Sequence, residues 1–144
     1  MAESRATTVW EGALASGNGV ASGASGAFGD LVVSYPTRVE REAGTTSPEE
    51  LLAAAHASCF CMSLAHVLGQ HGNLPEQIET TVIVDLDANP TAPSISSRLE
   101  VTGSVPGLDQ AAFEEAAASA GKNCPISGAL SGNIEIDVEA RLDG

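Results

Sequence analysis

An apolar segment of about twenty residues, from Pro48 to Leu68, constrains the fold of this chain more than any other feature. It predicts one helix, because Ser47 is a good N-cap, Pro48 suits the first helical position and Glu50 completes a capping box. A helix that is apolar nearly all round must be buried on most sides. Its acidic entrance, its internal histidines and the lack of flanking Lys or Arg argue against a membrane span.

Length and charge narrow the function classes. We expect residues 1–144 to form a single domain, since the chain is long enough for one core and short of two. Nineteen acidic residues against six basic ones give a net charge of −13, which argues against nucleic acid or an anionic membrane as partner. The start of the sequence has neither a secretory signal nor a lipidation motif, which predicts a cytoplasmic protein with reduced thiols.

The remaining pattern predicts an α+β fold without a parallel crossover. One helix is expected up to Ala120, with Asp109 as its N-cap. A second, short helix is expected after Cys124, which would be its N-cap. A polar connection is expected at 37–45. Strands are expected at 7–12, 30–35 and 133–142, with weak strands within 15–28. Residues 78–87 and 94–105 are expected to pair as an antiparallel hairpin. This single set of strands is too small to cover the apolar helix, which favours a second subunit as the remaining cover.

The three cysteines are the candidate chemical groups. Cys59 and Cys61 lie about 200° apart around the helix, so they cannot pair with each other, and Cys124 is the remaining partner. A helix start at Cys124 would stabilise a thiolate. Three buried, inert thiols are the alternative from spacing alone.

His56 offers a further alternative, because it lies three residues before Cys59 on the same helical face. A zinc site or a Cys–His hydrolase can therefore be considered. The zinc site would need four converging ligands, and no CxxC or HxxxH pair exists to supply two of them at a familiar spacing. The hydrolase lacks a nucleophile elbow. We expect no bound metal.

Three segments closely resemble signatures of the OsmC/Ohr family of thiol peroxidases. They are Thr37–Glu40 (TRVE), Gly44–Phe60 (GTTSPEELLAAAHASCF) and Gly121–Ser127 (GKNCPIS). The segments Val9–Gly12 (VWEG) and Val105–Gly107 (VPG) resemble the OsmC branch. The resemblance implies an OsmC-like α+β fold in which antiparallel sheets wrap around central apolar helices in an intertwined homodimer.

The resemblance also implies a reaction, the reduction of organic hydroperoxides to alcohols. It implies that Cys59 is the peroxidatic nucleophile, Cys124 the resolving cysteine, Arg38 the partner of the thiolate and Glu49 the acid that holds the arginine. The sulfenic acid of Cys59 would condense with Cys124 into a disulfide. No bound cofactor is expected, and the reductant would be an external dithiol, first a lipoyl protein and second thioredoxin.

Helix geometry adds a hypothesis about the dimer. Glu49 and Cys59 are ten residues apart, about 15 Å along a helix, so one arginine would not reach both in the same chain. Arg38 and Glu49 would then serve the partner's thiol across the interface. Cys61 departs from the family pattern, where a small residue such as serine is expected. The alternative function is a non-enzymatic stress or ligand-binding protein on the same fold.

Overall fold

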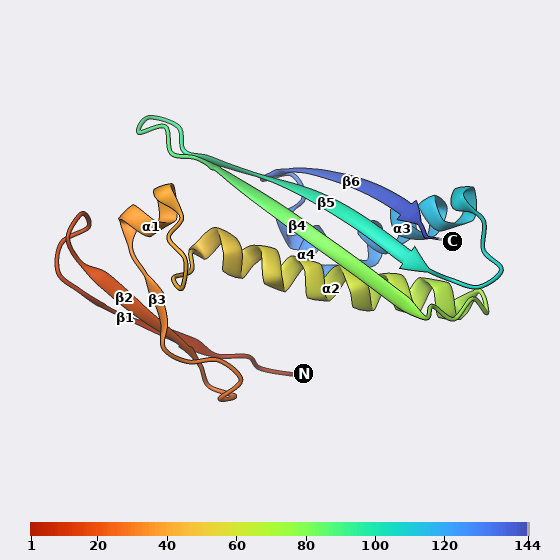
Figure 1. Ribbon diagram of the computed structural model, residues 1–144, viewed down its shortest axis with the longest axis horizontal. Coiled ribbons are helices and arrows are strands. Elements are labelled where there is room, and N and C mark those ends of the chain that lie inside the picture. Colours follow the sequence, from red (N-terminus) through yellow and green to blue (C-terminus); the bar gives the residue numbers. More distant parts are fainter. Residues whose placement is uncertain (144) are drawn as a thin grey trace. The chain divides into compact units, whose positions relative to one another are not determined.

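The predicted apolar helix is present as α2 (Pro48–Gln70) in the computed structural model, which describes residues 1–143 (Figure 1). Ser47 caps it as predicted, since its Oγ accepts a hydrogen bond of 3.1 Å from the backbone N–H of Glu50. The reciprocal half of the capping box was predicted wrongly. The Glu50 carboxylate accepts instead from the hydroxyl of Thr46, at 2.7 Å.

The chain divides into two compact units, residues 1–51 and the residues from Leu52 onward. The boundary falls within the first turn of α2. The single domain expected for residues 1–144 stays a prediction.

The first unit contains a three-stranded antiparallel sheet in the order β1-β2-β3. Its strands are β1 (Ala6–Glu11), β2 (Asn18–Gly23) and β3 (Leu31–Val33). All three lie within the predicted strand regions, except that β1 begins one residue earlier. The glycine-rich segment before β3 therefore forms a strand and turns rather than a linker.

Helix α1 (Tyr35–Glu40) corrects the polar connection predicted for 37–45. Ser34 ends the extended segment and caps this helix, because its Oγ accepts from the backbone N–H of Thr37 at 3.2 Å. The Thr37 hydroxyl accepts in return from the backbone N–H of Ser34 at 3.1 Å. This reciprocal cap, with Pro36 in the first turn, sets Arg38 on a helix rather than in a loop.

The second unit contains a sheet in the order β4-β5-β6 (Figure 1). Strands β4 (Gln77–Asp87) and β5 (Ser94–Ser104) form the predicted antiparallel hairpin. Strand β6 (Glu135–Leu142) pairs with β5 in parallel, which corrects the expectation of purely antiparallel sheets without a crossover. Between them the chain passes through α3 (Gln110–Asn123) and α4 (Pro125–Leu130), and a helical crossover of this kind returns a strand in the same direction.

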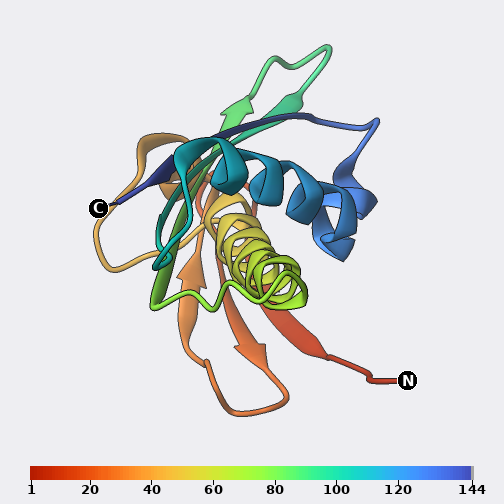
Figure 2. The same cartoon turned by 90° about the vertical axis from the view of Figure 1, so that its right-hand side faces the viewer.

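Helices α2 and α3 pack together with β5 around one hydrophobic core (Figure 2). Phe60 and Phe113 are fully buried, and a Cβ on Gly103 would lie 2.6 Å from the ring of Phe113. Only glycine therefore allows α3 to approach β5 this closely. Further core residues are Leu64, Val67, Leu68, Leu99, Val101, Val105, Ala116, Ala117, Ala120 and Cys124.

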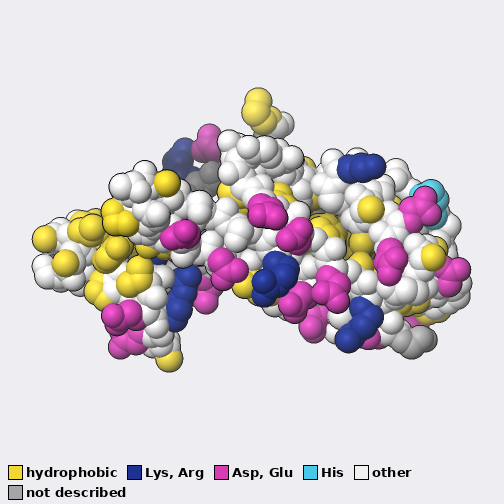
Figure 3. Space-filling view, turned by 90° about the horizontal axis from the view of Figure 1, so that it is seen from above, with side chains coloured by type: hydrophobic (Ala, Val, Ile, Leu, Met, Phe, Trp, Pro, Cys, Tyr) yellow, Lys and Arg dark blue, Asp and Glu magenta, His cyan; other side chains and the backbone are white. Residues whose placement is uncertain are grey.

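The outer surfaces of the two units differ in character. Figure 3 shows acidic side chains spread over the second unit and hydrophobic side chains gathered on the first. The exposed large hydrophobic residues of the first unit are Met1, Val9, Trp10, Leu14, Val20, Phe28, Val32, Tyr35 and Val39. Such a concentration is typical of a surface that another chain covers.

Burial of α2 is limited to one stripe of its surface. Phe60, Leu64, Val67 and Leu68 are buried, whereas Met62 on another face is 69% exposed. By length and composition α2 is the one described helix apolar enough to cross a membrane, a test that the core helix of a soluble protein also passes. Only 28% of its most apolar stretch is buried, so this helix has room for a further neighbour.

Candidate functional site

Two of the predicted site residues meet in the second unit. Cys59 lies on α2, and Cys124 stands between α3 and α4, where it caps the start of α4 as predicted. Their Sγ atoms are 3.1 Å apart, and both thiols are free. Cys59 is half-buried, whereas Cys124 is 1% exposed. An incoming molecule therefore has better access to Cys59.

Local hydrogen bonds fix the position of Cys124. Its backbone N–H donates to the carbonyl of Ala120 at 2.8 Å, which closes α3, and Pro125 then begins α4. The Ser63 hydroxyl of α2 donates to the same carbonyl at 2.9 Å. The end of α3 is thus held directly against α2, one turn after Cys59.

The two thiols ionise differently in this unit. Burial raises the pKa of Cys59, with the neighbouring thiol of Cys124 adding to the effect. Burial opposes ionisation of Cys124 as well, but hydrogen bonds from Ser127, Cys59 and the backbone of Ile126 together outweigh it and lower the pKa of Cys124. Among the described residues of the second unit, no cation contributes to the pKa of Cys59.

His56 and Ser127 extend the pair on the side of Cys124. His56 is fully buried, and its Nε2 lies 2.7 Å from the Oγ of Ser127. The backbone N–H of Ser127 donates to the Sγ of Cys124 at 3.5 Å. A Cys–His nucleophile would need a hydrogen bond between His56 and Cys59, and no such bond is present in residues 1–143. Ser127 was missed by the sequence reasoning, because its contact with His56 joins residues 71 positions apart and leaves no local signal.

Cys61 points away from Cys59, as the helix geometry predicted. Its Sγ donates to the hydroxyl of Thr80 on β4 at 3.1 Å, and its side chain is half-buried. It therefore contacts the sheet rather than the thiol pair.

The other two predicted residues meet in the first unit. Arg38 donates from Nε and Nη2 to the Oε1 of Glu49, at 2.9 and 2.7 Å. Glu49 is 1% exposed, while the side chain of Arg38 is 35% exposed. The carboxylate raises the pKa of the guanidinium through its hydrogen bonds. Glu49 thus anchors the arginine, whose remaining N–H groups include both of those on Nη1.

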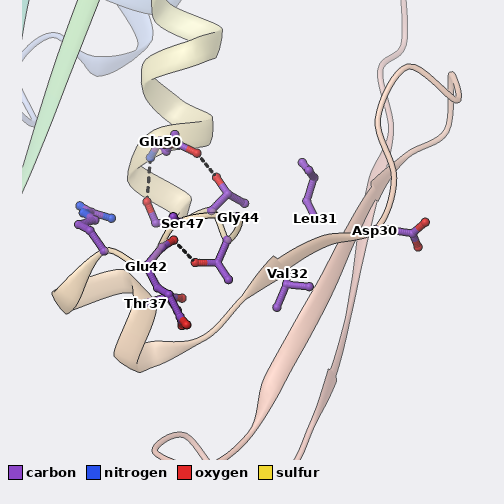
Figure 4. A pocket seen from close by; sticks show the side chains of 12 residues that line it. Asp30, Leu31, Val32, Thr37, Glu42, Gly44, Ser47 and Glu50 are labelled. Atoms are coloured by element: carbon purple, nitrogen blue, oxygen red, sulfur yellow. Dashed lines mark hydrogen bonds between the residues drawn. The ribbon is translucent and has the colours of Figure 1, made fainter.

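Arg41 approaches the second oxygen of the same carboxylate. Its Nη1 lies 4.0 Å from the Oε2 of Glu49, and that oxygen accepts no hydrogen bond from any described residue. Arg41 also lines an open cavity of about 600 Å³ between α1, β3 and the start of α2. Figure 4 shows Thr37, Glu42, Ser47 and Glu50 around this cavity, and none of the three cysteines lines it. Neither Arg38 nor Glu49 lines the cavity, so Arg41 alone connects it with the buried carboxylate.

Metal ligands do not cluster in the part of the chain that the structure describes. No group of three or more His, Cys, Asp or Glu side chains has a metal-binding arrangement there.

Comparison with known sequences gives consistent matches. A family model described as OsmC-like protein matches residues 41–139. Peroxiredoxin OsmC of Escherichia coli strain K12 is 38% identical over 135 residues, 92% of each chain. The organic hydroperoxide resistance protein of Xanthomonas axonopodis pv. citri is 31% identical over 109 residues, 74% of this chain and 75% of that protein.

Solved structures share the fold. An organic hydroperoxide resistance protein OsmC from Legionella pneumophila matches with a TM-score of 0.74 at 26% identity, covering 97% of this chain and 98% of its own. An organic hydroperoxide resistance protein from Elizabethkingia anophelis matches with a TM-score of 0.82 at 22% identity, covering 99% and 98%, and supports the fold alone. The predicted α+β, OsmC-like fold of a single chain is confirmed.

Proposed function

This chain belongs to the OsmC-like protein family, and from that premise we propose that it is a cysteine-based peroxidase that reduces organic hydroperoxides to alcohols. One observation carries the proposal: the Sγ atoms of Cys59 and Cys124 lie 3.1 Å apart, and only Cys59 has substantial access to solvent. A thiol pair with one accessible and one buried member suits a two-step oxidation to a disulfide.

In the first step the Cys59 thiolate attacks the terminal oxygen of the hydroperoxide. An S–O bond forms, the O–O bond breaks, and the alkoxide takes a proton and leaves as the alcohol. Cys59 is then a sulfenic acid. In the second step the Cys124 sulfur attacks the Sγ of Cys59, so that an S–S bond forms, the S–O bond breaks and water leaves.

Arg38 and Glu49 supply the charge for the first step in this proposal. Burial raises the pKa of Cys59 in the second unit, so a thiolate there needs a cation. Arg38 is suited to that role, because Glu49 holds its guanidinium while other N–H groups remain available. The guanidinium would also donate to the oxygen that leaves.

The homodimer is part of the proposal. An apolar helix covered on one stripe and a group of exposed hydrophobic residues in the first unit both support a second copy as their cover. The separation of Glu49 from Cys59 along α2, about 15 Å, favours an arginine supplied from the partner.

Turnover requires that the disulfide be reduced again. We propose an external dithiol protein, with a lipoyl protein as the first candidate and thioredoxin as the second, and no bound cofactor. A cytoplasmic location fits three cysteines that are free thiols.

Disulfide mapping tests the proposal directly. One equivalent of an alkyl hydroperoxide is added to the reduced protein, and the peptides are analysed by mass spectrometry. We expect a Cys59–Cys124 link that is absent in Cys59→Ser and retained in Cys61→Ser. Intact thiols after the peroxide would instead favour the non-enzymatic binding protein.

A further inference from the structure

The buried pair His56 and Ser127 has no role in the reaction described above, although it lies against the resolving cysteine. We propose that His56 is a positioning residue for disulfide formation: through Ser127 it holds the Cys124 sulfur ready to attack Cys59. The inference rests on the proposed function and adds two residues to it.

The tautomer of His56 follows from its surroundings. Burial lowers the pKa of His56, so the ring is neutral near pH 7 and carries one N–H. Nδ1 is buried and has no hydrogen-bond partner among the described residues, whereas Nε2 lies 2.7 Å from the Oγ of Ser127. A proton on Nδ1 would be unpaired, so the proton belongs on Nε2, which donates to Ser127.

That donation fixes the hydroxyl of Ser127. Because its oxygen accepts from Nε2 of His56 at 2.7 Å, the Ser127 side chain keeps one orientation next to Cys124. The same side chain is among the groups that lower the pKa of Cys124. The backbone N–H of Ser127 donates to the same sulfur at 3.5 Å. The backbone of Ser127 thus donates directly to the sulfur, and a hydrogen bond to the charged sulfur favours its thiolate.

The chemistry of the second step needs this arrangement. The Cys124 thiolate gives an electron pair to the Sγ of Cys59, the S–O bond of the sulfenic acid breaks, and the departing hydroxide takes up the proton that Cys124 lost. Cys124 is oxidised, the sulfenic sulfur is reduced, and water leaves. A fixed donor keeps the thiolate within 3.1 Å of its target.

Other titratable groups near Cys124 are few. Those on α2 are Cys59 and His56, and the last turn of α3 carries Lys122, which is not among the groups that shift the pKa of Cys124. From α4 only Ser127 and the backbone of Ile126 act on the thiol. After burial, which raises the pKa of Cys124, Ser127 is the group with the largest effect on it, and Ser127 lowers it.

The first experiment does not depend on peroxidase activity. The ultraviolet absorbance of the Cys124 thiolate is titrated in the full chain carrying Cys59→Ser and Cys61→Ser. We expect Ser127→Ala and His56→Leu each to give about tenfold less thiolate at a given pH, because one hydrogen bond to the charged sulfur is lost or misdirected. His56→Gln, whose amide N–H can replace Nε2–H, should restore most of it.

The second experiment measures the pH profile of disulfide formation after one equivalent of alkyl hydroperoxide. We expect His56→Leu to shift this profile to higher pH, without slowing sulfenic acid formation at Cys59. Ser58→Ala, on the exposed face of α2, is the matched control and should follow the wild type.

Two results would overturn the inference. One is an unchanged Cys124 titration in a folded His56→Leu chain, and the other is a His56→Gln chain no better than His56→Leu. If Ser127→Ala fails to fold, the two His56 variants still decide. A wild-type chain that forms no disulfide with peroxide would contradict the proposed function, while the titration would still test the hydrogen-bond network.

Discussion

At the scale of single residues, a thiolate at Cys59 needs a cation that its own unit does not supply. Burial raises its pKa, and the cations of the described second unit do not act on it. Arg38 is held by the buried carboxylate of Glu49 and keeps further N–H groups free to donate, so it is the residue best suited to this role. The central prediction at this scale therefore concerns the arginine.

Replacement of Arg38 by alanine should slow sulfenic acid formation at Cys59 by about tenfold or more, because an adjacent guanidinium lowers a thiol pKa by about one unit or more. Arg38→Lys should retain part of the rate, since the charge stays but the fork of donors is lost. Stopped-flow reaction with an alkyl hydroperoxide measures the effect. Arg98→Ala, an exposed ion-pair member in the second unit, is the control. Equal rates for Arg38→Ala and wild type would exclude the assigned role.

His56 makes stability depend on pH. Its pKa is lowered by burial, so the unfolded chain takes up a proton near pH 6.5 while the folded ring stays neutral to lower pH. The stabilisation is fully present above about pH 6.5 and is lost as pH falls through the folded pKa. The free energy of unfolding, measured with urea between about pH 5 and pH 7, should depend less steeply on pH for His56→Gln than for wild type. His71→Gln, an exposed histidine, should keep the wild-type slope; parallel curves for all three proteins would refute the assignment.

At the scale of elements, the start of α2 depends on its cap. Ser47→Ala should lower the free energy of unfolding by about 1 kcal/mol, because the N–H of Glu50 loses its acceptor in a site where Ser47 is 2% exposed. Ser58→Ala on the same helix should change it by less than about 0.5 kcal/mol, since that hydroxyl is exposed. Urea titration measures both, and equal effects would contradict the capping role.

Local patterns predict most of these elements. The apolar run, the Ser47 cap and the alternation of β4 and β5 are written in neighbouring residues, so the sequence indicates them directly. Helix α1 was missed because its cap uses Thr37 in place of the usual Glu or Gln. The direction of β6 was missed because alternation shows which face a strand buries but not which way its neighbour runs.

The site residues also differ in whether the local sequence predicts them. Cys124 at an N-cap follows from its local sequence, whereas the contact of His56 with Ser127 joins residues 71 positions apart and has no periodic signature. The pairing of Arg38 with Glu49 followed from family resemblance. Spacing alone would have left both as ordinary surface and helix-start residues.

At the scale of the whole molecule, sharing of the site between subunits can be tested by mixing variants. Dimers that combine an Arg38→Ala protomer with a Cys59→Ser protomer hold one complete site only if arginine and thiol come from different chains. We expect peroxidase activity to rise above that of either variant alone when the two are refolded together. No recovery, with dimers verified by sedimentation, would show that each site is built within one chain.

The most direct measurement of the central claim is the yield of alcohol per chain in a single turnover without reductant. Reduced wild type and Cys124→Ser should each convert about one equivalent of alkyl hydroperoxide, because Cys59 alone breaks the O–O bond, and Cys59→Ser should convert none. A Cys59→Ser chain that forms as much alcohol as wild type would contradict the account.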